Sequence, residues 1–209
     1  MSDHDDFAFE PIPGLPERLP EGEEILWQGR PDWWALTRSA LWFWPIAAWF
    51  AALVLWRFVA VSDQMPLTAA LWSVLPLVIM WAVVAMLLIA TAYAQAKASL
   101  YTVTNKRVVM RVGAALSVTF NLPYKQLANA EMEVRRDGTG TIALALKGKN
   151  RVSYLVAWPH VRPWYFRTQP ALRCIAEPKA VAALIAEHAA ARMSEPQITR
   201  VTPDAVPAE

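Results

Sequence analysis

Two long uncharged stretches constrain the fold of this chain more than any other feature. Residues 39–56 contain no charged side chain, and neither does the longer run from Thr68 to Tyr93. As a helix, the first run would be about 27 Å long, close to the hydrocarbon thickness of a bilayer. A buried helix pair in a soluble protein would keep a polar face, and these stretches have none. They predict a hairpin of two transmembrane helices over residues 39–60 and 68–93.

The composition supports membrane insertion, and the basic residues predict an orientation. Hydrophobic residues make up 56% of the 209 positions, and eleven of them are tryptophans. The connection between the two helices offers only Arg57, whereas both outer flanks carry several cations, at Arg30, Arg38, Lys97, Lys106, Arg107 and Arg111. Because cytoplasmic flanks are enriched in Lys and Arg, we expect both termini to lie in the cytoplasm.

Three tryptophans recur at intervals of seven in the first predicted helix. Trp42, Trp49 and Trp56 would share one face of the helix, because seven residues rotate a side chain by only about 20° from its starting direction. Two interpretations remain open: lipid-facing interface anchors, or a ridge that docks other membrane helices. The alanines between them, at 47, 48, 51 and 52, would allow close packing within the hairpin or self-association. Pro45 and Pro76 lie inside the predicted helices and predict kinks.

After Lys97 the apolar residues follow a period of two, which predicts half-buried strands. Alternation begins near residues 100, 107, 116, 127, 141 and 151, with turns at 137–141 and 148–150. We expect an antiparallel sheet or small barrel over residues 99–158, followed by a Trp- and Pro-rich connector at 159–176. Residues 177–193 predict a capping helix with a stripe of Val181, Leu184, Ile185 and His188. Residues 1–22 form an acidic, proline-rich arm, and 194–209 a flexible tail.

Groups that could carry catalysis are scarce. The predicted membrane helices contain no His, Asp, Glu or Lys, which argues against a proton relay, an ion site or an imidazole ligand for a pigment. Cys174 is the only cysteine, and no pair of the three histidines has metal-ligand spacing. We therefore expect a protein that is not an enzyme and has no metal or cofactor. Nucleic-acid binding is also disfavoured, because the Lys and Arg residues are not interleaved with exposed aromatic residues.

Two sets of residues are candidates for recognition. Arg107 and Arg111 share one predicted strand face, where each could contribute about 1 kcal/mol to contact with anionic lipid. A solvated face beside the membrane is the alternative. The second set lies in "AWPHVRPWYF" at 157–166, and it either fixes the link to the last helix or forms a docking surface: Trp158, His160, Arg162 and Trp164. A lone histidine without further ligands argues against a metal or pigment site.

Particular segments carry a family resemblance. "GEEILWQGRPDW" (22–33), two membrane helices and "YTVTNKRVVMRVG" (101–113) resemble the bacterial pleckstrin-homology-like membrane proteins. Within that group, "FEPIPGLPERLPEGEEILWQGRP", "VTNKRVVMRVGAALSVTFNLPY" and "AWPHVRPWYFRTQPALRCI" resemble the photosynthetic complex assembly proteins of purple bacteria, over residues 8–192. The resemblance implies a first strand at 23–30, before the hairpin. It further implies a cytoplasmic seven-stranded antiparallel barrel capped by the C-terminal helix, in the bacterial inner membrane.

The resemblance also implies a function. It predicts a non-enzymatic factor that binds reaction-centre and core light-harvesting (LH1) polypeptides during assembly, through the tryptophan-rich hairpin and the barrel. Membrane lipids and a second copy of the chain are further expected partners. A general membrane scaffold, or a sensor of anionic lipid, is the alternative from another class. An enzyme of pigment or lipid metabolism has the least support, because no set of acid, base and nucleophile is visible.

Overall fold

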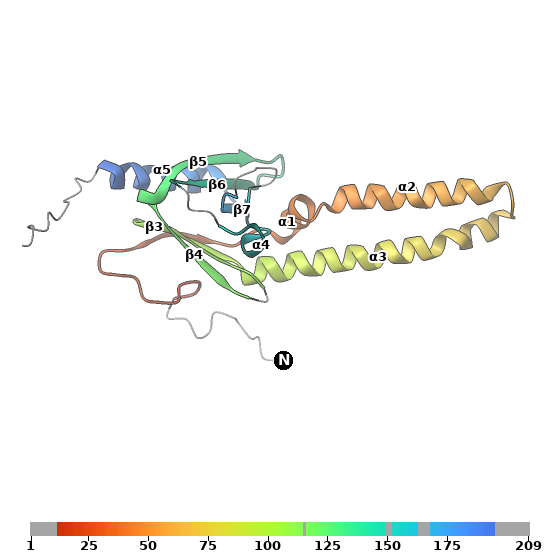
Figure 1. Ribbon diagram of the computed structural model, residues 1–209, viewed down its shortest axis with the longest axis horizontal. Coiled ribbons are helices and arrows are strands. Elements are labelled where there is room, and N and C mark those ends of the chain that lie inside the picture. Colours follow the sequence, from red (N-terminus) through yellow and green to blue (C-terminus); the bar gives the residue numbers. More distant parts are fainter. Residues whose placement is uncertain (1–11, 115, 149–151, 163–167, 195–209) are drawn as a thin grey trace, which may run out of the picture.

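The computed structural model describes residues 12–114, 116–148, 152–162 and 168–194. Figure 1 shows a long two-helix hairpin that projects from one end of a β-rich domain, which we call the β-domain. The hairpin consists of α2 (Phe43–Ser62) and α3 (Leu67–Ala98). The chain enters it from β1 (Ile25–Gly29) through the short helix α1 (Trp33–Ala40), and leaves it directly into β2 (Leu100–Thr104).

The predicted helical hairpin is confirmed. Both helices are long and apolar enough to cross a membrane, with mean hydropathies of 1.7 for α2 and 2.6 for α3. Only 6% of each most apolar window is buried inside the protein. Core helices of soluble proteins bury such surface against their own fold, whereas α2 and α3 leave theirs exposed, so both helices could cross a membrane.

The first helix begins later than predicted, because the chain breaks at Leu41 and Trp42. Leu41 caps the end of α1, and Trp42 adopts a left-handed backbone with a φ of 55°. Pro45 explains the break, since its ring would clash with the carbonyl of Leu41 in a continuous helix and it has no N–H to donate there. The predicted kink at Pro45 is therefore wrong: Pro45 occupies the first turn of α2, where a missing N–H costs nothing.

Helix α1 was not predicted, and it fills the corner between the hairpin and the β-domain. Its N-cap is Asp32, whose carboxylate accepts a hydrogen bond from the N–H of Ala35 at 2.6 Å. It contacts α3 and the last strand, β7 (Ala171–Ile175). Ala35 and Leu36 are buried there, together with Cys174 of β7. One face of α1 thus joins the membrane hairpin to the sheet.

The β-domain contains two antiparallel sheets. The first has the order β1-β2-β3-β4, with β3 at Arg107–Val112 and β4 at Val118–Pro123. The second has the order β5-β6-β7, with β5 at Leu127–Val134 and β6 at Gly140–Leu146. The closed barrel that we expected is not confirmed, because no pairing joins the sheets within the described residues. The short 3₁₀ turn η1 (Tyr124–Gln126) follows Pro123 and redirects the chain between them.

The core lies between the two sheets and is closed by α5 (Pro178–Ser194), as predicted for the capping helix. Val181 and Ile185 of α5 insert into a cluster formed by the inward side chains of both sheets. Strand β7 carries an irregularity at Cys174, which has a φ of 54°. This shift lets Leu172 and Ile175, three residues apart, both reach the core.

The last predicted strand was wrong. Residues 154–157 form the one-turn helix α4 (Tyr154–Ala157), whereas β7 comes from the segment that we expected to be a connector. The run Tyr154, Leu155, Val156, Ala157 is continuously apolar, and such a run does not distinguish a strand from a helix. The second sheet is instead completed by "ALRCI", all of which is buried.

The N-terminal arm is more ordered than predicted. From residue 12 it packs on the outer face of the first sheet, and Leu15 is buried there. The side-chain amide of Gln28 donates to the carbonyl of Pro13 at 2.7 Å. Gly14, with a φ of +80°, lies so close to the side chain of Leu100 that a Cβ would meet it at 2.6 Å. The arm therefore forms an extra layer over β2 and β3.

Candidate functional site

Four buried polar residues meet where the hairpin enters the β-domain. Ser99 ends α3, and Tyr101 follows it on β2. His160 lies three residues after α4, and Arg173 is on β7. Ser99, Tyr101 and His160 are completely buried, and Arg173 is 3% exposed. We call this group the junction cluster, because it contains the residue that leaves the hairpin together with residues from two strands and one loop of the β-domain.

Hydrogen bonds order the junction cluster in one direction. The backbone N–H of Arg173 donates to the Tyr101 oxygen at 3.3 Å, and we assign the Tyr101 hydroxyl proton to the hydrogen bond with Nδ1 of His160, because this tautomer gives the hydroxyl proton and both ring nitrogens a partner. A neutral imidazole that accepts at Nδ1 carries its proton on Nε2, which lies 2.9 Å from the Ser99 hydroxyl oxygen. The chain of donors thus runs from Arg173 through Tyr101 and His160 to Ser99.

Burial keeps the cluster in this protonation state. Desolvation, with a smaller contribution from the cation of Arg173, lowers the pKa of His160 to about 3. Desolvation also raises the pKa of Tyr101 well above its usual range, so the phenol keeps its proton. The imidazole is therefore neutral at physiological pH and fixed by two side-chain hydroxyls.

Arg173 extends the cluster to α1 and to the segment after α4. Its guanidinium donates to the Pro159 carbonyl at 3.1 Å and to the Ser39 hydroxyl at 3.4 Å. Burial lowers the pKa of Arg173, yet a guanidinium stays charged in proteins. Among the described residues no carboxylate pairs with it, and its Nε has no hydrogen-bond partner. In the part of the chain that the structure describes, backbone and hydroxyl oxygens hold the charge.

The neighbouring thiol belongs to the same junction. The Cys174 sulfur lies 3.3 Å from the Ser39 hydroxyl and accepts a hydrogen bond from Arg135 at 3.0 Å. Its backbone carbonyl accepts from the N–H of Asp32, the cap of α1. The start of α1 and its last turn are therefore both tied to one residue of β7.

The Ser99–His160 pair has the spacing of a nucleophile and its base, but it lacks the surroundings that a catalytic pair requires. A hydrolase needs a substrate beside the serine and a carboxylate that orients the histidine. Here Ser99 and His160 are sealed from solvent, and a tyrosine hydroxyl takes the place of the orienting carboxylate. Within the described residues no group of three or more His, Cys, Asp or Glu side chains is placed to hold a metal ion. The arrangement connects the hairpin to the β-domain through hydrogen bonds.

Comparison with known proteins identifies the family. Residues 33–189 match the family described as bacterial PH domain, a span that takes in the hairpin and strands β2 to β7 but begins after β1. The chain belongs to this family. The β-domain is accordingly a PH-like domain, and the apolar hairpin lies between β1 and β2 along the chain.

Two individual proteins show how far the similarity reaches. An uncharacterized 23.7 kDa protein in the puhA 5′ region of Rhodobacter capsulatus is 47% identical over 207 residues, which cover 95% of this chain and 94% of the relative. A crystal structure of a DUF1696 family protein with a pleckstrin-homology domain, from Shewanella loihica, has 15% identity and a TM-score of 0.31. That similarity covers 44% of this chain and 70% of the other.

The residues predicted as a docking surface after α4 have different places in the PH-like domain. His160 is a buried member of the junction cluster and contacts Ser99, so its side chain is not exposed on a surface after α4. Trp158 is half-buried. Arg162 ion-pairs with Glu131 of β5 at 2.8 Å. Trp164 lies outside the described residues.

The predicted lipid-binding arginines do not form an open face. Arg107 lies at the end of β3 farther from the hairpin, because β2 runs away from α3 before the chain returns. Its Nε donates to Glu23 at 2.7 Å. Arg111 is nearer the hairpin, opposite Leu100, but is only 8% exposed. Both interpretations, a lipid site and a solvated face, require a strand that nothing covers. The N-terminal arm instead lies across a pocket of about 360 Å³ that Arg107 also lines.

The predicted tryptophan stripe is divided by the helix break. Trp49 and Trp56 lie on α2 and are 65% and 69% exposed. Trp42 precedes the helix at the left-handed turn. Aromatic contacts at the base of the hairpin join α1 to both hairpin helices. Trp33 and Trp34 of α1 contact each other. Trp33 also contacts Tyr93 of α3, and Trp34 contacts Phe43 at the start of α2. Such rings are typical of a membrane interface.

Ser99, Tyr101 and Arg173 were missed by sequence reasoning. Each lies in a short segment whose neighbours are apolar, and nothing in its spacing separates it from a surface residue. The signal that could have raised suspicion is Arg173 inside "ALRCI", a charged residue within an otherwise apolar strand.

Proposed function

We propose that this protein is a non-enzymatic membrane assembly factor for the photosynthetic reaction centre and its core light-harvesting complex. The observation that carries the proposal is the relative that is 47% identical over nearly its whole length and is named for its place in the puhA 5′ region. Because puhA is a photosynthesis gene, a role in the photosynthetic membrane is compatible with that position. The bacterial PH domain family itself does not specify a partner.

In this proposal the hairpin spans the inner membrane with both termini in the cytoplasm. Arg38 and Lys97 flank the end of the hairpin that joins the PH-like domain, whereas Arg57 is the cation near its far end. The excess of basic residues on the domain side supports a cytoplasmic domain. Helices α2 and α3 are antiparallel and contact each other along the hairpin, as Figure 1 shows.

The lateral contact with assembling subunits is assigned to the exposed side of α2. Trp49 and Trp56 present two large indole rings that contribute little to packing within the protein. Lipid chains are as apolar as the helices, so a helix–helix contact in the membrane depends on shape and on close packing. Rigid indoles provide a large contact area at low cost in side-chain entropy. The ridge would bind the transmembrane helices of reaction-centre or LH1 polypeptides.

The junction cluster gives the PH-like domain a fixed place above such a contact. Ser99, at the end of α3, is bonded to His160, and Ser39 of α1 is bonded to Arg173. A rigid junction presents the domain at one height and one angle to the cytoplasmic part of the same subunit. The proposal needs no catalytic group, and it assigns Ser99 and His160 a structural role.

A deletion strain tests the proposal. Removing the gene should lower the near-infrared absorbance of the reaction centre and core antenna while pigment synthesis continues, and the wild-type gene should restore it. Affinity purification of the tagged protein from growing cells should recover reaction-centre or LH1 polypeptides. Normal spectra in the deletion strain would contradict the proposal. Recovery of unrelated membrane proteins or anionic lipids alone would favour the alternative, a general scaffold or lipid sensor.

A further inference from the structure

We propose that the PH-like domain makes a second contact with the bilayer, through α4 and the turn between β3 and β4. The contact consists of the side chains of Tyr154, Leu155 and Val156 on α4 and Leu116 in the turn, and its partner is the headgroup layer of the membrane. The inference rests on the proposed membrane-spanning hairpin, and it adds a surface that holds the domain against the lipid.

The exposure of these side chains is the first observation. Leu155 is 86% exposed and Leu116 is 84% exposed, and Tyr154 and Val156 are each about half exposed. Single exposed apolar residues are common on soluble proteins, but three consecutive large ones are not. Tyr154 adds a ring with a polar tip, the side chain that membrane interfaces favour.

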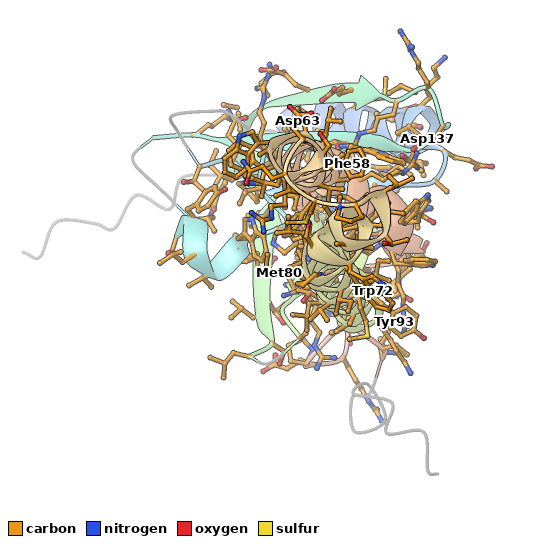
Figure 2. The ribbon with its side chains drawn as sticks, turned by 90° about the vertical axis from the view of Figure 1, so that its right-hand side faces the viewer. Phe58, Asp63, Trp72, Met80, Tyr93 and Asp137 are labelled. Atoms are coloured by element: carbon orange, nitrogen blue, oxygen red, sulfur yellow. The ribbon has the colours of Figure 1, made fainter. Side chains whose placement is uncertain are left out.

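Their place in the fold is the second observation. Leu100 of β2, two residues after α3, pairs with Arg111 of β3, so the turn that follows β3 lies at the level of the hairpin base. α4 lies at the same level, because His160 just beyond it is bonded to Ser99 at the end of α3. Figure 1 shows α4 beside the base of α3. Figure 2 looks along the hairpin toward the domain, and the cyan turn of α4 stands beside the hairpin rather than behind it.

The length of α3 places this end of the domain at the lipid surface. The predicted spanning segment ends at Tyr93, before Gln95 and Lys97, and five residues lie between Tyr93 and Ser99. At 1.5 Å per residue this segment is about 8 Å long, similar to the headgroup layer of roughly 5–7 Å on each side of the hydrocarbon. Side chains that point from the domain back toward the hairpin therefore enter the headgroup layer.

The charge at the same end is complementary to anionic lipid. The turn between β5 and β6 carries exposed Arg136, and its neighbour Asp137 ion-pairs with Arg38 of α1 at 2.7 Å. This pair ties the turn to the hairpin base. Figure 2 shows Asp137 on the opposite side of the hairpin from α4, so Arg136 adds a cation to the same end of the domain and not to the apolar turn itself. A cation at this end is attracted to anionic lipid.

Site-directed fluorescence in vesicles tests the contact. Single variants Leu155→Cys, Met80→Cys and Gln126→Cys of the full chain are labelled with an environment-sensitive thiol probe and reconstituted into phosphatidylcholine–phosphatidylglycerol vesicles, with or without brominated acyl chains. Cys174 is completely buried, and the unsubstituted protein measures its background labelling. Met80 lies in the middle of α3 as the spanning reference, and Gln126 lies in the turn after β4, at the far end of the domain.

We expect the Leu155 probe to show a blue shift and roughly twofold more quenching by brominated lipid than the Gln126 probe, because it penetrates the interface. A Leu155 probe that matches Gln126 while Met80 is quenched would overturn this contact and leave the spanning hairpin intact. Quenching at Leu155 without quenching at Met80 would support the contact and refute the hairpin's insertion. Protection of Leu155 only after photosynthetic subunits are added would overturn the lipid contact and mark a protein interface instead.

Discussion

The Ser99 hydroxyl oxygen lies 2.9 Å from Nε2 of His160, although the two residues are 61 positions apart in the chain. Ser99 is the cap of the longer hairpin helix, and His160 follows the apolar turn α4. This contact joins the apolar hairpin to the segment that follows the exposed apolar residues of α4. The imidazole makes the junction sensitive to pH, because burial lowers its pKa and disfavours its charged form.

Acidification should destabilise the junction between pH 6.5 and 3. The pKa of His160 is about 3 in the folded state and about 6.5 when unfolded, so in this window the unfolded chain binds one more proton. The stability contributed by neutral His160 is complete above pH 6.5 and is lost as the pH falls. We expect the free energy of unfolding to drop by about 1 kcal/mol between pH 7 and 5.5. Denaturant unfolding of the full chain in nanodiscs, followed by near-UV circular dichroism, measures it.

His160→Gln is the matched control, since its amide can still bond a hydroxyl but does not titrate. Its unfolding free energy should be lower at pH 7 by about 2 kcal/mol, because the buried Tyr101 hydroxyl loses its ideal acceptor. Its dependence on pH between 7 and 5.5 should be nearly flat. An equal slope in both proteins would show that another group titrates in this window.

The left-handed turn at Trp42 should prefer glycine to alanine. Trp42→Gly and Trp42→Ala both remove the indole, but only alanine keeps a Cβ at a φ of 55°. A left-handed backbone costs a residue with a Cβ about 1 kcal/mol. We therefore expect the glycine variant to unfold at higher temperature than the alanine variant. The reverse order would mean that the break between α1 and α2 does not persist in the membrane.

Gly14 should tolerate alanine less well than Gly138 does. Both glycines have a φ near +80°, so the backbone strain is shared. A Cβ at Gly14 would also collide with the Leu100 side chain at 2.6 Å, whereas nothing lies within 4 Å at Gly138. Gly14→Ala should therefore be less stable than Gly138→Ala by about 1 kcal/mol. It should also accelerate proteolysis at Arg18 in the arm, and equal cleavage in both variants would contradict the packing of the arm.

The tryptophan ridge should carry the contact with partner helices. Trp49→Ala combined with Trp56→Ala should lower recovery of reaction-centre or LH1 polypeptides in affinity purification by roughly tenfold, as expected for loss of buried aromatic anchors. Both side chains are mostly exposed, so the hairpin itself should remain intact. Trp72→Ala on α3 is the control, because Trp72 is similarly exposed at 71% but lies outside the ridge. An equal loss with Trp72→Ala would indicate a general effect of tryptophan on membrane insertion.

The sequence by itself determined the elements whose pattern is local. The hairpin follows from long runs without charge, since an unpaired charge is too costly in hydrocarbon. Strands β2 to β6 and the capping helix follow from periods of two and 3.6, which place one face toward a core. These rules need no knowledge of the partner element.

Tertiary contacts decided the rest. "YLVA" and "ALRCI" are both short apolar runs, and only the buried position between β6 and α1 made the second a strand. The sequence alone allowed a docking role and a structural role for His160 equally. In the structure its imidazole is surrounded by Ser99 and Tyr101, which are about 60 residues away in the chain. Pro45 was visible in the sequence, yet its effect falls on the carbonyl of Leu41, four residues earlier, and starts a new helix instead of bending one. Burial and hydrogen bonding depend on which segments meet, and no local period encodes that.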